Sequence, residues 1–302
     1  MPLNPATDEY PVVDLPRPQK GANTQHLLVT MLGEFWRHTN LWLPARPIKH
    51  LLADLGVSQT AAATALSRLS ARGVLEHSGG GRHSKYRFTP DARARLNVGF
   101  EQITHFGNPS RSWDRMWTAI AFTIPETSRD LREVFRSRLR WLGFAPLYGA
   151  LWVCPHDRMA EVETYCHGFG IEDYLIFRMS EDQRRGRYPG EAWILDEAPE
   201  RYLKFLETYQ PAIVQAEKNG ITGKDAFKLR VQIMDTWRAF PWDDPDLPAE
   251  MLPKQWPLGP ARETFVRLYT QLTPATHDYL ITTIQNYCPD AVSGIQLELI
   301  ET

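Results

Sequence analysis

The stretch PARPIKHLLADLGVSQTAAATALSRLSARGVLEHSGGGRHSKYRF, residues 44–88, decides the fold of this chain. Its first part has apolar residues at the i, i+3, i+4, i+7 spacing of one helix face. These residues are Ile48, Leu51, Leu52 and Leu55. Pro47 suits the first helical position, because its missing N–H would have no partner there. Gly56 stands where a helix ends in the left-handed conformation, so the sequence predicts a helix from Pro47 to just before Gly56.

A second helix is predicted to start only three residues after the first one ends. Ser58 can accept a hydrogen bond from the N–H groups of the next turn and so begin this helix. Its buried stripe is Ala62, Ala65, Leu66 and Leu69, and its outward residues are Thr60, Ala63, Thr64, Ser67 and Arg68. A tight joint that contains glycine is typical of helix-turn-helix units. Because the outward side chains include no carboxylate that would repel phosphate, they suit a helix in a DNA major groove.

A basic β-hairpin is predicted to follow. Val74 and Leu75 mark its first strand, Tyr86 and Phe88 mark its second, and a loop with three glycines joins them. Over residues 58–95, seven basic residues outnumber two acidic ones, which gives a local net charge of +5. The basic residues are Arg68, Arg72, Arg82, Lys85, Arg87, Arg93 and Arg95. We therefore expect a winged helix-turn-helix that binds DNA in a salt-dependent way, the alternative being a charged surface hairpin.

The composition limits the class of protein. A length of 302 residues allows two or three domains. The formal net charge of −2 excludes a protein that coats nucleic acid through bulk charge, although it permits a local basic patch. Three cysteines without a Cys-x-x-Cys pair indicate a reducing cytosol. Since no run approaches the ~20 uncharged apolar residues that span a bilayer, we expect a soluble cytoplasmic protein.

We expect an α+β multidomain chain of four segments. Residues 1–22 carry five prolines and lack the apolar run of a secretory signal, so they are predicted to be a disordered arm. The other segments are a winged helix-turn-helix DNA-binding domain over 23–106, a central domain over 107–190 and a mostly α-helical C-terminal domain over 191–302.

The pattern of the central segment predicts a ferredoxin-like βαββαβ domain. Its first strand should place Ile120, Phe122 and Ile124 on one face, and Pro125 should end it. A helix over residues 127–142 is predicted to bury Leu131, Val134, Phe135, Leu139 and Leu142. Two short strands within 144–153, a helix over 157–167 and a strand over 174–177 are predicted to complete the domain.

In the C-terminal segment, apolar residues at helical spacing over 202–206 and 226–234 predict two helices. The acidic stretch over 235–248 contains three prolines and three aromatic residues. A loop of this composition is rigid, and we expect it to dock helices together or onto a partner chain.

Several motifs lie along the chain in a fixed order. They are Gly56-Val57-Ser58, Thr64-Ala65-Leu66-Ser67-Arg68-Leu69, Gly73-Val74-Leu75, Gly81-Arg82, Tyr86-Arg87-Phe88-Thr89, Trp113-Asp114-x-x-Trp117, the run WLGFAPL over 141–147, the loop over 235–248 and the run LPKQW over 252–256. This set resembles the PaaX family of phenylacetic-acid-pathway repressors over nearly the whole chain beyond residue 23. One departure is Ala63, where that family usually has an arginine.

The resemblance implies a homodimeric transcriptional repressor of an aromatic-acid catabolic operon. Such a repressor leaves its double-stranded DNA operator when an aryl-acyl-CoA effector, such as phenylacetyl-CoA, binds. For this chain, we expect Gln59, Thr60, Thr64, Ser67 and Arg68 to read bases, and Arg82, Lys85 and Arg87 to contact phosphates. An effector site needs cations and aromatic walls, for which the candidates are Arg115, Arg136, Arg140, Trp141, Tyr148 and Trp152. No catalytic residue, metal or other cofactor is expected.

Three alternatives remain open. A metal-dependent nucleic-acid-processing enzyme built on the central domain would use Asp114 as a metal ligand, although such sites usually need several converging carboxylates. A zinc site could draw on the Cys and His residues at 154, 156, 166 and 167, although their spacing matches no known finger pattern. A winged helix used only for docking proteins would show no salt-sensitive binding of nucleic acid.

Overall fold

The computed structural model describes residues 24–108, 113–180, 186–193, 198–218 and 220–300. These residues form two compact units. Among them, the smaller unit contains residues 106–202 and 240–259, and the larger unit contains residues 24–105, 203–239 and 260–300. The arm expected over residues 1–22 lies outside the described residues. No helix in the described part of the chain is both long and apolar enough to cross a lipid bilayer.

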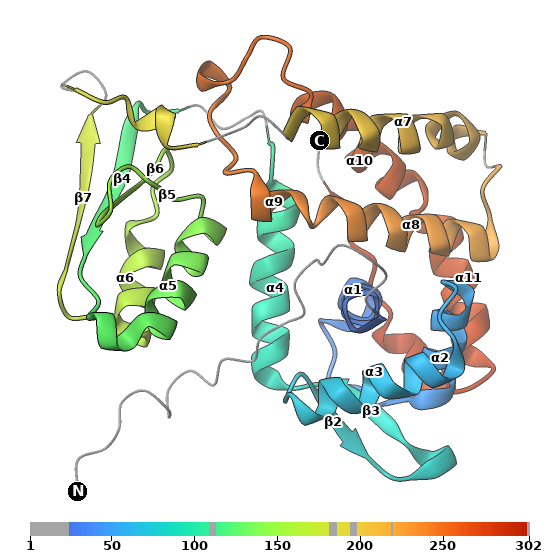
Figure 1. Cartoon of the computed structure of the whole chain (residues 1–302). Coiled ribbons are helices and arrows are strands. Elements are labelled where there is room, and N and C mark those ends of the chain that lie inside the picture. Colours follow the sequence, from blue (N-terminus) through green and yellow to red (C-terminus); the bar gives the residue numbers. More distant parts are fainter. Residues whose placement is uncertain (1–23, 109–112, 181–185, 194–197, 219, 301–302) are drawn as a thin grey trace, which may run out of the picture. The chain divides into compact units, whose positions relative to one another are not determined.

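The larger unit begins with four α-helices and a small sheet (Figure 1). Its first elements are α1 (Thr24–Trp36), β1 (Leu43–Pro44), α2 (Ala45–Asp54), α3 (Gln59–Ala71), β2 (Leu75–Ser78), β3 (Lys85–Phe88) and α4 (Pro90–His105). The strands form an antiparallel sheet in the order β1-β3-β2, with Leu43 opposite Tyr86 and Leu75 opposite Phe88. A short 3-10 turn, Gly81–His83, lies between β2 and β3.

Helix α2 begins two residues earlier than the sequence indicated. Pro44 is extended, with φ of −60° and ψ of 146°, and the helix starts at Ala45. Pro47 therefore lies inside the first turn instead of at its first position. The N–H groups of a first turn have no partner within the helix, so proline is tolerated at each of these positions.

The joint between α2 and α3 has the local structure that the sequence predicted. Gly56 has a φ of +85°, a conformation that residues with a Cβ rarely adopt. The Ser58 Oγ accepts a hydrogen bond from the Ala61 N–H at 3.2 Å and caps the start of α3. The glycine and the serine cap together fix a short turn between the two helices.

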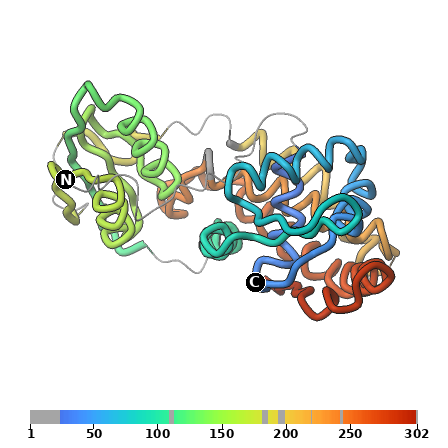
Figure 2. The backbone as a smooth tube through the Cα atoms, turned by 90° about the horizontal axis from the view of Figure 1, so that it is seen from below, coloured from blue at the N-terminus to red at the C-terminus, as the bar shows by residue number. Residues whose placement is uncertain are grey.

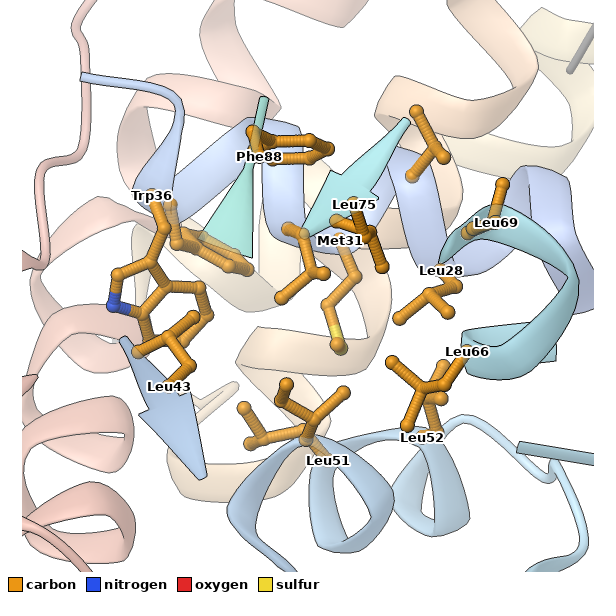
Figure 3. Packing of buried hydrophobic residues seen from close by; sticks show 14 of the residues in the cluster. Leu28, Met31, Trp36, Leu43, Leu51, Leu52, Leu66, Leu69, Leu75 and Phe88 are labelled. Carbon is orange, nitrogen blue, oxygen red and sulfur yellow. The ribbon is translucent and has the colours of Figure 1, made fainter. Parts of the chain in front are cut away.

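One hydrophobic core joins α1, α2, α3 and the small sheet, and side chains from each of them point into it (Figure 3). It includes Leu28 and Met31 of α1, Leu51 and Leu52 of α2, Leu66 and Leu69 of α3, and Leu75 and Phe88 of the hairpin. Ten of the 13 residues of α1 are buried, so this helix is enclosed by the others instead of covering a surface.

The C-terminal half of the chain adds further helices, two of which complete the same core. These helices are α7 (Ala198–Glu217), α8 (Gly223–Trp237), α10 (Leu258–Gln271) and α11 (Thr273–Gln285), followed by the 3-10 turn Pro289–Gly294. Phe227 and Val231 of α8 and Leu280 and Ile284 of α11 belong to the core that contains α1, α2 and α3. Figures 1 and 2 both show blue N-terminal helices beside orange and red C-terminal ones within this unit. The domain boundaries near residues 22, 106 and 190 stay predictions.

The smaller unit is built on one four-stranded antiparallel sheet. Its elements are β4 (Met116–Phe122), α5 (Arg129–Trp141), β5 (Ala145–Pro146), β6 (Leu151–Cys154), α6 (Met159–Gly168) and β7 (Tyr174–Ser180). The strand order is β5-β6-β4-β7. The short helix α9 (Phe240–Asp243) belongs to the same unit. Together, the two units confirm the expected α+β, multidomain character of the chain.

Each face of this sheet has its own core. Helices α5 and α6 cover one face, where Ile120 and Trp152 pack with Phe135 and Leu139 (Figure 1). On the other face, Trp117 packs with a set of mostly aromatic residues. This set includes Trp113, Tyr188, Trp193 and Met251.

Two details of this unit differ from the sequence analysis. Ile124 packs in the core but lies beyond the end of β4, at Phe122. Val134 was predicted to be buried, yet 38% of its surface is exposed. Successive helix residues differ by about 100°, so Val134 is turned away from the face that Phe135 and Leu139 bury.

Candidate nucleic-acid interface

The outer face of α3 consists of short polar side chains. Gln59, Thr60, Thr64, Ser67 and Arg68 are all exposed, which is where the sequence analysis placed them. The helix contains no acidic residue at any position. The opposite face of α3 packs in the core through Ala62, Ala65, Leu66 and Leu69, so the core holds the exposed face in place. The surface is thus compatible with close approach to a polyanion.

Ala63 and Gln59 mark the limits of this face. The Ala63 side chain, which was predicted to face outward, is half-buried and so is turned partly toward the protein. The Gln59 Nε2 donates a hydrogen bond to the carbonyl oxygen of Lys49, at 3.4 Å. This contact ties the first residue of α3 to α2.

The wing, which we define as residues 75–88, presents two cations to solvent. Arg82 and Lys85 are exposed, and neither has a carboxylate partner among the described residues. The Arg82 Nε donates to the Nε2 of His83 at 3.1 Å, so this ring nitrogen acts as an acceptor. A guanidinium without a carboxylate partner is free to bind phosphate.

Arg87 is placed differently from what the sequence analysis assumed. Its guanidinium forms an ion pair with Glu76, with Nε and Nη2 each 2.6 Å from Oε2. It also lies over the Trp42 ring, 4.4 Å from the ring centroid. The register of the hairpin causes this pairing, because Glu76 lies directly opposite Arg87. Arg87 therefore supports the wing through protein contacts, and Arg82 and Lys85 are the wing arginine and lysine that are exposed among the described residues.

The sequence analysis missed two histidines on the wing. The His77 ring stacks on Tyr86, with centroids 4.9 Å apart, and both His77 and His83 are exposed. Their position in the hairpin was a usable signal, since His77 precedes the glycine loop and His83 follows Arg82. Histidine donates hydrogen bonds to phosphate from either ring nitrogen.

The six expected effector residues lie in the smaller unit, in unequal environments. Trp152 is 2% exposed and belongs to the core under α5. Arg140 lies over it, 5.3 Å from the ring centroid. Arg136 pairs with Glu133 at 3.1 Å. The remaining three are an exposed Arg115 before β4, a half-buried Trp141 at the end of α5 and an exposed Tyr148 before β6. Trp152 has no free surface to offer a ligand, so its expected role as a pocket wall is corrected to a core residue.

A cavity of about 580 Å³ also lies in the smaller unit. Its charged lining consists of Asp114, Asp157, Asp246 and Lys254, and none of the six expected effector residues lines it. Lys254 is the one lysine or arginine among these lining residues, whereas the phosphates of a CoA thioester need several cations. The cavity therefore does not fit the expected effector.

The geometry around Asp114 gives it a structural role. Its Oδ1 accepts a hydrogen bond from the Met116 N–H at 2.9 Å, and its Oδ2 accepts one from Arg178 at 2.6 Å. Asp157 also pairs with Arg178, at 2.7 Å. The two carboxylates thus converge on an arginine, an arrangement that satisfies them without a metal ion.

The cysteines and histidines weighed for zinc do not form a ligand set. Cys154 is buried and donates to the carbonyl oxygen of Leu142 at 3.5 Å, and His156 is bonded through Nε2 to the Asp246 carbonyl at 2.6 Å. Burial raises the pKa of both Cys154 and Cys166 to about 12, whereas zinc binds the thiolate. Over the described residues, no group of three His, Cys, Asp or Glu side chains is arranged to hold a metal ion.

Comparison with known families accounts for most of the chain. Residues 23–92 match the family "PaaX-like protein", residues 110–190 match "PaaX protein central Cas2-like domain" and residues 193–282 match "PaaX-like protein C-terminal domain". The chain belongs to the PaaX family, which confirms the resemblance seen in its motifs. Proteins of this family are transcriptional regulators and not enzymes.

Individual relatives share low sequence identity with this chain. The chain is 27% identical over 260 residues to the transcriptional repressor PaaX of Escherichia coli strain K12, a match that covers 82% of this chain and 80% of the relative. A solved structure, the uncharacterized protein Rv0674 from Mycobacterium tuberculosis, aligns with a TM-score of 0.48 and 20% identity, covering 90% of this chain and 99% of that one.

Proposed function

We propose that this protein is a DNA-binding transcriptional repressor and that α2, α3 and the wing form a winged helix-turn-helix. The observation that carries the proposal is the exposed face of α3, which is free of carboxylates and lies in the same compact unit as the wing cations Arg82 and Lys85. The curated relative is itself named a transcriptional repressor. Such a protein would act where the DNA is, in the cytoplasm.

In this proposal, α3 lies in the major groove and the wing contacts the sugar-phosphate backbone. Thr60, Thr64, Ser67 and Arg68 would contact base edges, and Arg82 and Lys85 would neutralise phosphates. Family resemblance supports a homodimer, whose two heads would read half-sites about 34 Å apart. With a single charged side chain on the outer face of α3, a large share of the affinity would come from the wing.

The test begins with a duplex selected by the purified protein from a random-sequence DNA library. Arg68→Ala is expected to reduce the preference for the selected duplex over unrelated DNA, because Arg68 contacts a base. Arg82→Ala is expected to weaken binding to both and to lower the slope of log K against log salt by about one, because it removes one phosphate contact. Lys204→Ala, which removes an exposed cation from α7, serves as the control.

Two outcomes would reject the assignment. One is the recovery of no preferred duplex by the unmodified protein. The other is unchanged affinity in both variants at moderate salt, which would show that neither α3 nor the wing contacts DNA.

We further propose that an aryl-acyl-CoA, such as phenylacetyl-CoA, releases the protein from the operator of an aromatic-acid catabolic operon. The family resemblance supports this ligand class. Helix α5 offers cations of the kind such a ligand needs, because Arg138 and Arg140 have no carboxylate partner among the described residues. The cavity at Asp114, Asp157 and Asp246 has the opposite charge.

Thermal unfolding tests this ligand. Phenylacetyl-CoA is expected to raise the melting temperature and to release the selected duplex, while phenylacetate and free CoA should do neither at equal concentration. Arg140→Ala should reduce the stabilisation. A melting temperature that phenylacetyl-CoA leaves unchanged would exclude it as the effector.

The smaller unit is best interpreted as a ferredoxin-like domain. Its βαββαβ order and its strand order β5-β6-β4-β7 both agree with that fold. Because Asp114 is engaged by Arg178, we do not favour nuclease chemistry for this domain.

A further inference from the structure

Asp54 is the last residue of α2 and lies just before the turn into α3. Its side chain is only 13% exposed, although aspartate is usually solvated. Three side chains surround it. Tyr279 of α11 donates a hydrogen bond to its Oδ2, Lys224 of α8 lies 3.9 Å from its Oδ1 and His50 lies 3.6 Å from its Oδ2.

The position of this carboxylate is unfavourable for α2 taken alone. The C-terminal end of a helix carries partial negative charge, so an acidic residue there is destabilised by the helix dipole. The turn does not need the aspartate either, because Gly56 supplies the left-handed conformation and Ser58 supplies the cap of α3. The carboxylate is therefore explained by its contacts with α8 and α11.

A second contact joins the same helices one turn earlier. Tyr287 follows α11, and its hydroxyl lies 3.3 Å from the Nδ1 of His50. The Arg46 guanidinium lies over the same tyrosine ring, 5.1 Å from its centroid. Polar contacts with the α11 segment thus run along α2 from its first turn to its last residue.

Tyr279 is itself held firmly. Burial and the hydrogen bond to Asp54 raise its pKa to about 12, so the hydroxyl stays a donor at neutral pH. Its ring lies 5.6 Å from that of Phe227 on α8, which in turn lies 5.8 Å from Phe35 on α1. The donor to Asp54 is therefore fixed by the same core that fixes α1.

We propose that Tyr279 is a positioning residue for DNA reading: its contact with Asp54 fixes the end of α2 and thereby the angle at which α3 enters the major groove. This inference rests on the proposed function and assigns to the C-terminal helices an indirect part in sequence recognition, through the position of α3. Base-edge hydrogen bonds require an accurate helix position, whereas contacts with phosphates tolerate small rotations. The contact should therefore affect specific binding far more than nonspecific binding.

The test compares Tyr279→Phe with the unmodified full-length chain. Both are titrated with the duplex selected from a random library and with an unrelated duplex of equal length. Tyr279→Phe is expected to bind the selected duplex about tenfold more weakly, since it removes a hydrogen bond to a charged group. Its affinity for the unrelated duplex and its salt slope should stay unchanged, because Arg82 and Lys85 are intact.

Asp278→Asn is the matched control, because this residue is on the same helix and its side chain is 85% exposed. Asp54→Asn provides a second variant with the same shape. Asp54→Asn should lower the preference for the selected duplex. The double variant should show no lower preference than the single variant with the larger loss, since both substitutions remove the same contact. Melting temperatures of all variants show whether the fraction of folded protein is unchanged at the temperature of the titration.

The outcomes separate this inference from the proposed function. An unmodified protein that selects no duplex would overturn both. An unmodified protein that selects a duplex, with an unchanged preference in Tyr279→Phe and Asp54→Asn, would overturn the positioning role alone. Equal losses on the selected and unrelated duplexes would also overturn it, because they indicate only a loss of folded protein.

Discussion

At the scale of single residues, the environment decides what a charged side chain does. The sequence pattern does not distinguish Arg68, Arg82 and Arg87. In the structure the first two are exposed, whereas Arg87 pairs with Glu76 and lies over the Trp42 ring. Cross-strand register creates that difference, because it brings Glu76 opposite Arg87. The sequence identified the basic patch but not which of its members are free.

Asp244 shows the same effect on a titrating group. It is buried in the smaller unit, where its Oδ2 accepts from the Tyr202 hydroxyl at 2.6 Å and its Oδ1 accepts from the Asp246 N–H at 2.8 Å. Both bonds favour the carboxylate, but burial opposes it more strongly and raises the pKa to about 6. The folded state therefore holds this proton more tightly than the unfolded state.

The sign of the stability change follows from this raised pKa. Below the pKa of Asp244 in the unfolded state, the carboxyl is protonated in both states, and its stabilising contribution to the free energy of unfolding is complete. This contribution is lost as the pH rises through the pKa of Asp244 in the folded state. Between about pH 4 and about pH 7, the unfolding free energy of the unmodified protein should fall by about 2 kcal/mol more than that of Asp244→Asn. Urea unfolding at the two pH values measures this difference. Equal pH dependence in the two proteins would contradict the assignment.

At the scale of elements, the wing depends on a backbone conformation that glycine provides. Gly79 has a φ of +76°, and a Cβ added there would lie 2.4 Å from the backbone oxygen of His83. This is too close for any side chain to be accommodated without moving the backbone. The glycine therefore fixes the turn that carries Arg82.

Gly79→Ala is expected to distort the tip of the wing and to weaken DNA binding about tenfold, because it displaces a phosphate-binding cation. The tip is exposed, so the melting temperature should change little. Gly80→Ala is the matched control, since Gly80 has a φ of −150° and open space around its Cα. Titration with the selected duplex measures the affinity of both variants. An affinity of Gly79→Ala equal to that of Gly80→Ala and of the unmodified protein would show that the tip does not contact DNA.

At the scale of the whole molecule, the C-terminal helices α8 and α11 share one core with α1, α2 and α3. Arg230 of α8 is fully buried, and its Nε lies 2.9 Å from the Oε1 of Glu34 on α1. It also donates to the carbonyl oxygens of Tyr269 and Glu298, at 2.6 and 3.0 Å, and to the Thr273 hydroxyl at 2.5 Å. The larger unit is therefore held together by a buried ion pair as well as by its apolar core.

Arg230→Met should lower the unfolding free energy by about 3–5 kcal/mol, because it leaves the Glu34 carboxylate buried without its cation. Arg267→Met, which breaks an exposed ion pair with Glu217, should cost less than about 1 kcal/mol. Urea unfolding followed by circular dichroism measures both. Similar losses of unfolding free energy in the two variants would show that the buried ion pair stabilises the protein no more than the exposed one.

The sequence by itself determined the local structure of this protein. The helical spacing of Ile48, Leu51 and Leu52, the glycine at 56 and the cap at Ser58 defined α2, the turn and α3, because the interactions involved span only a few residues. The same short-range signals defined the hairpin and the order of strands and helices in the smaller unit. They also identified the exposed face of α3 and the family of the chain.

The tertiary structure alone decided which distant residues meet. The pairings of Arg230 with Glu34 and of Tyr279 with Asp54 join segments about 200 residues apart in the chain. Periodicity shows that a helix has a buried face, but it does not identify the helix that covers it. For that reason the sequence indicated the exposed face of α3, whereas only the folded chain showed that α8 and α11 contact the end of α2 next to it.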